Sequence, residues 1–265
     1  MCDTAALAAR LRGLGRVILG YSGGVDSALL AVVGAQALGP ERFLAVLGVS
    51  PSLSAGQRAQ AESLAAAFSV PLEVIETGEF DDPRYAANPT NRCYFCKTEL
   101  WRQLRAVAAR GFDTIIDGTN ADDLDEHRPG ALAGQEHGLR SPLAELGWTK
   151  AMVREAARGL GIPIWDAPAA PCLASRVQYG LAVTPERVRQ VEAGEAWLRE
   201  LGVAGNLRVR HHGGTARIEL DPAEFGVVDG RWDEVERRFR RLGFEAVVRD
   251  PAGYRRGSLL PLASV

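Results

Sequence analysis

A six-residue turn, Ser22-Gly-Gly-Val-Asp-Ser27, constrains this chain more than any other part of its sequence. It follows the apolar run 16–21 and leads into the Ala- and Leu-rich run 28–38, which predicts a strand, a tight turn and a helix. The first N–H groups of a helix have no intrahelical partner and lie at its positive end, where they bind anions. The turn is therefore predicted to hold a phosphate group.

The residues of the turn suit that role. Gly23 and Gly24 let the backbone adopt a positive φ and approach a ligand closely. Ser22 and Ser27 offer hydroxyls, and Asp26 offers a carboxylate suited to Mg²⁺. The turn is not a Walker A loop, because its glycine spacing differs and no Lys-Ser/Thr pair ends it. A plain turn that caps a helix would account for the glycines, but not for the paired serines and the aspartate.

Composition limits the other possibilities. The chain has 265 residues and 46% hydrophobic content, enough for one large domain or two modest ones. Its 31 Lys and Arg against 33 Asp and Glu leave a net charge of −2, which argues against nucleic acid as the main partner. The sequence shows neither a signal-peptide pattern nor an apolar run near the ~20 residues that a bilayer span needs. We therefore expect a cytoplasmic protein without a membrane partner, whose four cysteines serve metal or sulfur chemistry.

The alternation of apolar runs and helical patterns predicts an α/β fold. A doubly wound, Rossmann-like parallel sheet is expected over residues 1–180, followed by a smaller α+β domain over residues 181–265. The strands expected in the first domain are 16–21, 42–49, 72–76 and 112–117. The elements expected in the second are a helix at 185–201, a hairpin across Gly213-Gly214, a helix at 231–242 and a strand at 244–249.

Polar residues follow the fourth expected strand. Gly118, Thr119 and Asn120 come directly after it, and several acidic residues come next. Open α/β sheets bind ligands at the carboxyl ends of their strands. Gly118 and Asn120 are therefore candidate nucleotide contacts, and the acids are either Mg²⁺ ligands or a solvated loop.

Three cysteines lie in two short segments. Cys93 and Cys96 form a C-x-x-C at the start of a helix expected from Thr98 to about Arg110, whose dipole favours thiolates. Cys172 lies in a stiff, proline-rich stretch. From the residues alone, the C-x-x-C can be a redox dithiol, half of a zinc site or two ligands of an iron–sulfur cluster.

Four segments together resemble the LarE family of PP-loop ATP pyrophosphatases, which are sulfur transferases in the biosynthesis of the nickel-pincer nucleotide cofactor of lactate racemase. They are the SGGVDS turn and the segments 91–97, 117–123 and 171–176, and the resemblance extends from about residue 12 to about 250. It implies an adenine nucleotide alpha hydrolase-type domain that uses ATP and Mg²⁺. It also implies a small-molecule nucleotide substrate, pyridinium-3,5-biscarboxylic acid mononucleotide, and a homo-oligomer. ATP would adenylate a carboxylate of that substrate with release of PPi, and sulfur would then replace AMP to give a thiocarboxylate.

The resemblance also implies roles for the cysteines. The sulfur-bearing cysteine of the family maps onto Cys172. Members with all three thiols are thought to hold a [4Fe–4S] cluster with one iron open to carry a sulfide, which here implies Cys93, Cys96 and Cys172 as ligands. A sacrificial Cys172 beside an idle or redox-active C-x-x-C is one alternative, and a zinc site is another.

Four further residues combine pattern with resemblance. Glu195 lies on the apolar stripe of the expected helix 185–201, where a carboxylate needs a partner or a function; the alternative to a function is a salt bridge inside a subunit contact. Arg208 and Arg210 share one strand face and are predicted to point outward, as a phosphate clamp or as a solvated hairpin face. Trp101 matches a tryptophan of the family's substrate pocket, or it is a core residue.

Three other functions remain open. Ammonia-using synthetases of the NAD and GMP synthetase type share the SGGVDS turn but need no cysteines. A tRNA-thiolating PP-loop enzyme should carry a basic stripe, against which the near-neutral charge argues. A nucleotide- or metal-sensing module without catalysis is the third.

Overall fold

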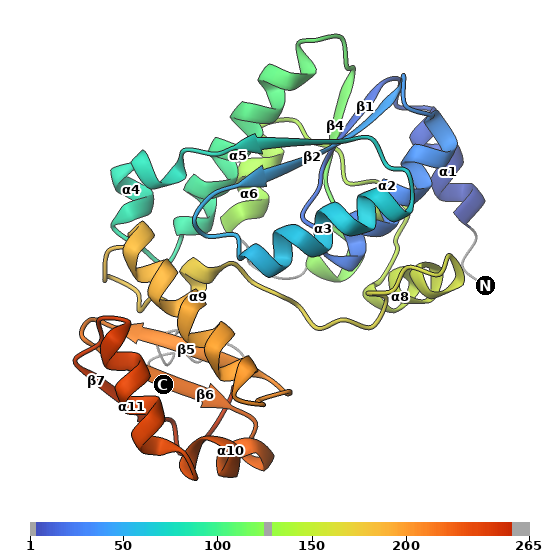
Figure 1. Cartoon of the computed structure of the whole chain (residues 1–265). Coiled ribbons are helices and arrows are strands. Elements are labelled where there is room, and N and C mark those ends of the chain that lie inside the picture. Colours follow the sequence, from blue (N-terminus) through green and yellow to red (C-terminus); the bar gives the residue numbers. More distant parts are fainter. Residues whose placement is uncertain (1–3, 125–128, 256–265) are drawn as a thin grey trace, which may run out of the picture. The chain divides into compact units, whose positions relative to one another are not determined.

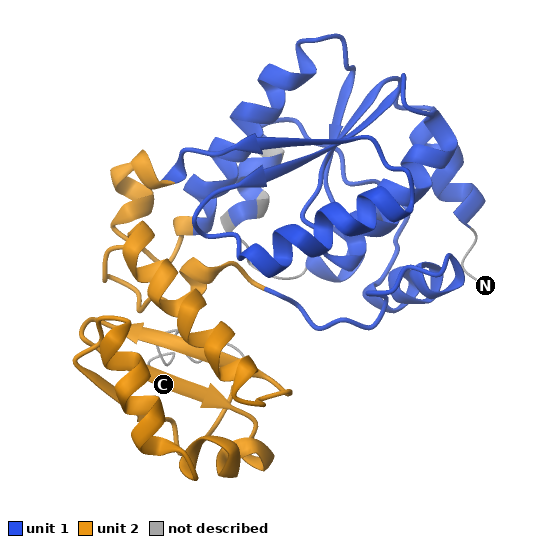
Figure 2. Cartoon of the chain, viewed as in Figure 1, with its two compact units in different colours: residues 1–79, 93–170 blue, residues 80–92, 171–265 orange. Residues whose placement is uncertain are grey.

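The computed structural model describes residues 4–124 and 129–255 (Figure 1). It divides into two compact units: unit 1 is Met1–Glu79 with Cys93–Ala170, and unit 2 is Phe80–Arg92 with Pro171–Val265 (Figure 2). The division therefore falls at residue 170 rather than 180, and unit 2 also includes residues 80–92, which were expected in the first domain.

Hydrogen bonds from Asn88 explain why residues 80–92 belong to unit 2. The Asn88 side chain is buried, and its Nδ2 donates to the carbonyls of Val177, Gln178 and Leu181 at 3.3, 2.8 and 2.9 Å. Val183 N–H donates to the carbonyl of Ala86 at 2.8 Å. Local sequence patterns carry no sign of bonds between segments so far apart in the chain, which is why the predicted boundary differs from this division.

Unit 1 contains a parallel sheet of four strands: β1 (Val17–Gly20), β2 (Phe43–Val49), β3 (Leu72–Glu76) and β4 (Thr114–Ile116). Their order is β3-β2-β1-β4, and every pair is parallel. This confirms the predicted α/β fold.

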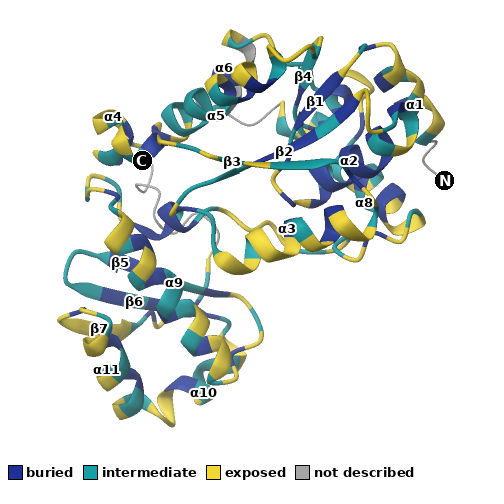
Figure 3. Cartoon of the chain, turned by 45° about the horizontal axis from the view of Figure 1, so that its top comes forward, coloured by how far each residue is buried: buried dark blue, intermediate teal, exposed yellow. Residues whose placement is uncertain are grey.

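Helices cover both faces of this sheet because its apolar residues alternate between two cores. Val17 and Leu19 pack into one core, whereas Ile18 packs into the other. The helices that contribute to the first core are α1 (Thr4–Arg12), α2 (Val25–Leu38), α3 (Ala55–Ala67), α7 (Pro142–Glu145) and α8 (Lys150–Gly159). Those that contribute to the second are α5 (Arg92–Ala108) and α6 (Pro129–Glu136). Figure 3 shows β1 and α2 as largely buried.

The strand order places a topological switch point between β1 and β4. From β1 the chain adds β2 and then β3 on one side, and later returns to add β4 on the other side. At such a point, consecutive connections leave toward opposite faces of the sheet and open a crevice beyond the strand ends. The SGGVDS turn follows β1, and Gly118 to Asn120 follow β4, so both lie at this crevice.

Unit 2 is a small α+β unit, as predicted. Its sheet has the order β5-β6-β7, with β5 (Leu207–His212) antiparallel to β6 (Thr215–Leu220) and β7 (Ala246–Arg249) parallel to β6. Its longer helices are α9 (Pro185–Glu200) and α11 (Trp232–Arg241). The hairpin turn contains Gly213 with φ +69°, a conformation that favours glycine.

Short helices that the sequence patterns did not predict fill several loops. They are α4 (Pro83–Ala86), α10 (Phe225–Asp229) and four 3₁₀ segments: η1 (Glu79–Asp81), η2 (Ala121–Asp123), η3 (Leu173–Arg176) and η4 (Pro222–Glu224). α6 and α7 were not predicted either. These segments are too short to show a helical period in sequence. Within the described ranges, no helix is long and apolar enough to cross a membrane.

Candidate active site

The SGGVDS turn is a rigid loop that opens α2. Helix α2 begins at Val25, so Asp26 and Ser27 lie in its first turn. Ser27 Oγ donates to the carbonyl of Gly24 at 3.0 Å and accepts from Ser22 N–H at 3.2 Å. Gly23 has φ +73°, and a Cβ there would lie 2.7 Å from the Cβ of Ala61. The loop therefore needs glycine at this position, and its serines fix its shape.

Asp26 links the turn to two distant segments. Its Oδ1 accepts from Asn120 Nδ2 at 3.1 Å, and its Oδ2 contacts the ammonium of Lys150. Lys150 is the first residue of α8, and its backbone N–H donates to Asp122 Oδ2 at 2.8 Å. The turn after β1, the loop after β4 and the start of α8 thus meet at one carboxylate.

Gly118 brings the loop after β4 against the SGGVDS turn. A Cβ at Gly118 would lie 3.1 Å from Ser27 N and 3.4 Å from Asp26 Cβ. The neighbouring Asp117 is occupied within its own loop, because Thr119 Oγ1 donates to Oδ2 at 2.9 Å and Ser141 Oγ donates to Oδ1 at 2.7 Å. Gly118 therefore allows a close approach, and Asp117 holds the loop that makes it.

The carboxylate oxygens of Asp26 are ligands of the kind that Mg²⁺ prefers. Among the described residues, no three His, Cys, Asp or Glu side chains converge to hold a metal ion. Mg²⁺ does not need such a cage, since it is usually bound by one or two carboxylates, the phosphates of the substrate and water. Asp26 offers one such carboxylate. The ammonium of Lys150 contacts the same carboxylate.

The C-x-x-C lies inside a helix rather than before one. Helix α5 begins at Arg92 instead of Thr98, so Cys93 and Cys96 occupy its first two turns and share one face. Cys93 is exposed and Cys96 half-buried. Cys172 is half-buried and precedes η3 in unit 2. These three cysteines form no disulfide, and three thiolates are a donor set that suits an iron–sulfur cluster.

Trp101 is a core residue that carries a buried indole N–H. It is 3% exposed and packs with Ile18 and Leu104 in the second core. The ammonium of Lys97 lies 5.1 Å from the centre of the indole ring. The indole Nε1 is buried and has no hydrogen-bond partner among the described residues. Trp101 therefore combines its predicted core role with a donor that a ligand can use.

Glu195 has the partner that its place on an apolar stripe requires. Arg176 forms an ion pair with it, with Nε 3.0 Å from Oε1 and Nη2 3.2 Å from Oε2. Val209 N–H also donates to Oε1, at 3.1 Å. The salt bridge foreseen for Glu195 thus lies within one chain.

The two arginines of β5 differ. Arg210 is buried, with Nε 2.8 Å from Glu219 Oε2 and Nη1 donating to the carbonyl of Ser175 at 3.1 Å. Arg208 is half-buried over the ring of Tyr254 and forms no ion pair with any described residue. Burial, and then the charge of Arg176, lower the pKa of Arg208. The prediction that both point outward is wrong for Arg210, because β5 and β6 bury its side chain on Glu219.

Sequence patterns missed Lys150 and Arg176. Only two of the 31 basic residues are lysines, Lys97 and Lys150, and both contact predicted site residues. Lysine in the first turn of a helix also opposes the helix dipole, which marks Lys150 as unusual. Arg176 has no such signal, since its role depends on contacts within the folded unit.

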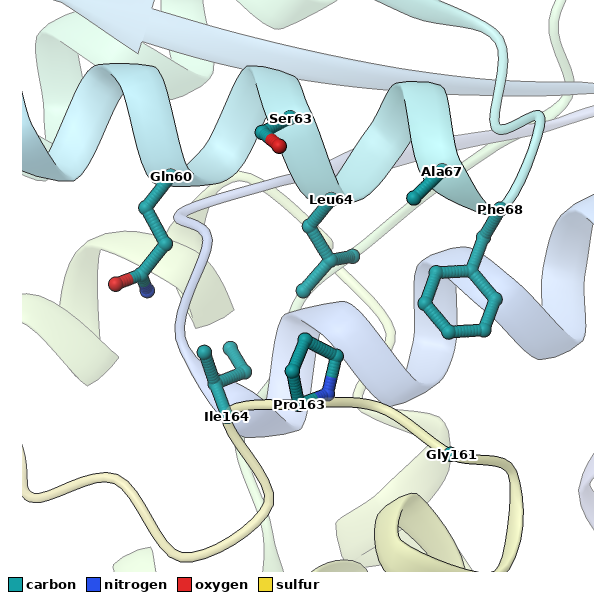
Figure 4. A pocket seen from close by; sticks show the side chains of 8 residues that line it. All are labelled: Gln60, Ser63, Leu64, Ala67, Phe68, Gly161, Pro163 and Ile164. Atoms are coloured by element: carbon teal, nitrogen blue, oxygen red, sulfur yellow. The ribbon is translucent and has the colours of Figure 1, made fainter.

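A hollow of about 400 Å³ lies elsewhere on unit 1 (Figure 4). Its lining comes from α3 and the segment after α8: Gln60, Ser63, Leu64, Ala67, Phe68, Gly161, Pro163 and Ile164. The lining contains no titratable side chain and none of the predicted site residues. The hollow is therefore separate from the candidate active site.

A strand, an SGGVDS turn and a helix at the switch point of a parallel sheet define the PP-loop class of ATP-dependent enzymes, and this chain is an enzyme of that class. Residues 6–105 match the NAD synthase family. The chain is 34% identical to the pyridinium-3,5-bisthiocarboxylic acid mononucleotide synthase of Lactiplantibacillus plantarum, over 96% of this chain and 92% of that protein. The chain belongs to the family of that synthase, the LarE family.

Two other relatives match over most of their length. An uncharacterized protein of Synechocystis is 44% identical, over 93% of this chain and 92% of its own. An uncharacterized protein of Methanocaldococcus jannaschii is 30% identical, over 88% of each chain. The match to this family therefore spans both units, whereas the NAD synthase match covers part of unit 1 and only residues 80–92 of unit 2.

Proposed function

We propose that this protein is an ATP-dependent sulfur transferase that converts a carboxylate of pyridinium-3,5-biscarboxylic acid mononucleotide into a thiocarboxylate. The product would serve the nickel-pincer nucleotide cofactor of lactate racemase, and the reaction would take place in the cytoplasm. The observation that carries the proposal is the near full-length match to the Lactiplantibacillus plantarum synthase, together with a phosphate loop joined to Asn120 and Lys150.

Adenylation is the first step. A carboxylate oxygen is a poor leaving group, so the substrate oxygen attacks the α-phosphorus of ATP and PPi leaves. The N–H groups at the start of α2 and the ammonium of Lys150 neutralise charge on the departing phosphates. Asp26 would hold Mg²⁺, which supplies charge neutralisation on the same oxygens.

Sulfur transfer is the second step. A sulfur nucleophile attacks the acyl carbon, a carbon–sulfur bond forms, the carbon–oxygen bond to AMP breaks and AMP leaves. Cys93, Cys96 and Cys172 would hold a [4Fe–4S] cluster, which supplies sulfide when bound. The donor set of three cysteine sulfurs, which form no disulfide, is the kind that binds such a cluster and supports this assignment.

The mononucleotide needs an anion site and an apolar surface. Arg208 supplies a half-buried guanidinium that pairs with no carboxylate of the described part of the chain, which suits a phosphate. Trp101, in unit 1, offers an indole N–H without a hydrogen-bond partner among the described residues, and Glu195, in unit 2, offers a carboxylate that is paired with Arg176. We assign ATP to unit 1, and substrate binding and assembly into a homo-oligomer to unit 2.

Two assays on one anaerobic preparation test the proposal: PPi release, and thiocarboxylate formation by mass spectrometry. Wild-type protein should show both, and iron and sulfide should exceed zinc. Cys172→Ala should release PPi but form no thiocarboxylate. An ammonia-using synthetase would instead give an amide that does not require Cys172, and a sensor module would release no PPi above background. Zinc in place of iron would replace the cluster assignment by a zinc site. Conversion of Cys172 to dehydroalanine after one turnover would replace it by a sacrificial Cys172.

A further inference from the structure

The guanidinium of Arg176 binds the backbone of the segment that carries Cys172. Arg176, four residues further along, is buried, and its Nη1 donates to the carbonyls of Pro171 and Cys172 at 2.5 and 3.0 Å. The same Nη1 lies 3.1 Å from Ser175 Oγ. The side chain of Arg176 therefore folds back over the backbone from which Cys172 projects.

The carbonyl of Cys172 receives three donors. Besides Arg176 Nη1, it accepts from Ser175 N at 3.0 Å and from Ser175 Oγ at 2.7 Å. A peptide oxygen has two lone pairs, so three donors leave it little freedom to turn. The carbonyls of Pro171 and Cys172 belong to the two peptide planes that meet at the Cα of Cys172, so holding both restricts φ and ψ there and with them the direction of the Cα–Cβ bond.

The other edge of the same guanidinium fixes the segment to the rest of unit 2. Arg176 Nε and Nη2 form a two-point contact with Glu195 of α9, and Glu195 Oε1 accepts from Val209 N–H of β5. A planar guanidinium is suited to this contact because its donors lie in a fixed fork. Cys172 is thus linked through one side chain to a helix and a strand.

A second arginine supports the end of the segment. Arg210 Nη1 donates to the carbonyl of Ser175, and its Nε pairs with the fully buried Glu219. Glu219 also pairs with Arg217 at 2.8 Å. The carbonyls of Pro171, Cys172 and Ser175 are therefore all held by guanidiniums anchored in unit 2.

We propose that Arg176 is a positioning residue for sulfur transfer, which holds the Cys172 segment in one conformation through its bond to Glu195. The inference rests on the proposed function, in which Cys172 takes part in the sulfur step and not in adenylation. In this inference, the Arg176–Glu195 ion pair orients the Cys172 thiol and does not bind the substrate phosphate. Lysine at position 176 would keep the charge but could not bridge the carbonyls and Glu195 at once.

The test compares Arg176→Met, Arg176→Lys and Arg199→Met with wild type. Arg199 is a matched control, because its Nη1 also donates to two loop carbonyls, of Val203 and Gly205 at 2.8 and 2.7 Å, in the same unit. Three quantities are measured: PPi release, thiocarboxylate formed in a single turnover, and amide hydrogen exchange of the peptide over residues 172–178.

In Arg176→Met, we expect thiocarboxylate formation to fall about 100-fold while PPi release stays within about twofold, and exchange of the peptide to rise about tenfold. Arg176→Lys should lie between this variant and wild type, and Arg199→Met should match wild type in all three. Unchanged exchange in α11 shows that unit 2 remains folded in each variant.

Two results would overturn the inference: unchanged exchange over residues 172–178 in Arg176→Met, or a parallel loss of PPi release and sulfur transfer in that folded variant. Failure of the proposed function is a different observation, since wild-type protein itself would then form no thiocarboxylate. In that case the exchange measurement still decides whether Arg176 fixes the Cys172 segment.

Discussion

The ammonium of Lys150, at the start of α8, contacts the carboxylate of Asp26, in the first turn of α2. Asp26 also accepts from Asn120 Nδ2 at 3.1 Å. Without ATP, the two charges neutralise each other at the mouth of the phosphate loop. In the proposed function, we expect the phosphates of ATP to be a stronger partner for the ammonium, which would leave the Asp26 oxygen to Mg²⁺.

Lys150→Met should therefore slow PPi release about 100-fold, because a charge at the departing phosphates is lost. The measurement is the steady-state rate of PPi formation with saturating ATP. Arg154→Met is the control, since Arg154 lies one turn further along α8 and, within the ranges that the structure describes, donates only to the carbonyl of Ala167, at 3.2 Å. A wild-type rate in Lys150→Met would show that the lysine is only a structural partner of Asp26.

Gly118→Ala tests the close approach of the β4 loop to the phosphate loop. The added Cβ would lie 3.1 Å from Ser27 N, so one of the two loops must move. We expect the KM for ATP to rise about tenfold, which corresponds to about 1.4 kcal/mol. The matched variant Gly159→Ala, whose Cβ would meet nothing within 4 Å, should keep the KM and raise stability by about 0.5–1 kcal/mol. Equal KM values in the two variants would remove Gly118 from the site.

Substitutions of Arg208 and Arg210 should have different effects. Arg208→Met should weaken substrate binding, and Arg210→Met should lower the free energy of unfolding. Arg210→Met removes one of the two arginines that pair with the fully buried carboxylate of Glu219, and should lower the free energy of unfolding by about 2 kcal/mol. Arg208→Met breaks no ion pair with a residue that the structure describes and should change stability by less than about 1 kcal/mol, but raise the KM for the mononucleotide about tenfold or more. Urea unfolding and substrate titration of both variants measure these effects. The assignment of the phosphate to Arg208 fails if its removal leaves the KM unchanged.

His211 should make unit 2 sensitive to acid. Its Nε2 is 2.9 Å from Gln190 Oε1, and because Gln190 Nε2 donates to the carbonyl of Leu242, that oxygen must accept and His211 Nε2 must carry the hydrogen. Its Nδ1 is buried without a partner among the described residues, so protonation there is unfavourable. Burial, and then the charges of Arg187 and His212, lower the pKa of His211 from 6.5 to about 4.

The sign of the effect follows from linkage. Between pH 6.5 and 4 the unfolded chain binds the His211 proton and the folded chain does not, so stability falls as the pH decreases through this range. We expect a loss of about 1–3 kcal/mol from this residue, complete below pH 4 and absent above pH 7. His211→Phe should be less stable at neutral pH but should lose less on acidification, as measured by urea unfolding at several pH values. Identical pH slopes for both proteins would rule out His211 as the cause.

Much of the fold was predictable from local patterns. The four parallel strands, the SGGVDS turn, α9 and the hairpin of unit 2 all follow from runs of apolar residues and from the glycines that end them. Thr184 and Pro185 predict the start of α9, because a capping hydroxyl and a fixed φ both favour a helix start. In the structure, the Thr184 hydroxyl accepts from Arg187 N–H. The start of α5 was placed six residues late, at Thr98 instead of Arg92, because asparagine, arginine and cysteine give no helical period.

The sequence by itself determined the class of site, since glycines, paired serines and an aspartate between a buried strand and a helix suit a phosphate group in any context. Tertiary structure alone decided which distant side chains complete it. Lys150 reaches Asp26 across 124 positions of sequence, Asn88 joins residues 80–92 to unit 2, and Arg176 closes the Cys172 segment. Such contacts depend on where helices and strands pack in space, and the spacing of residues along a chain does not record that.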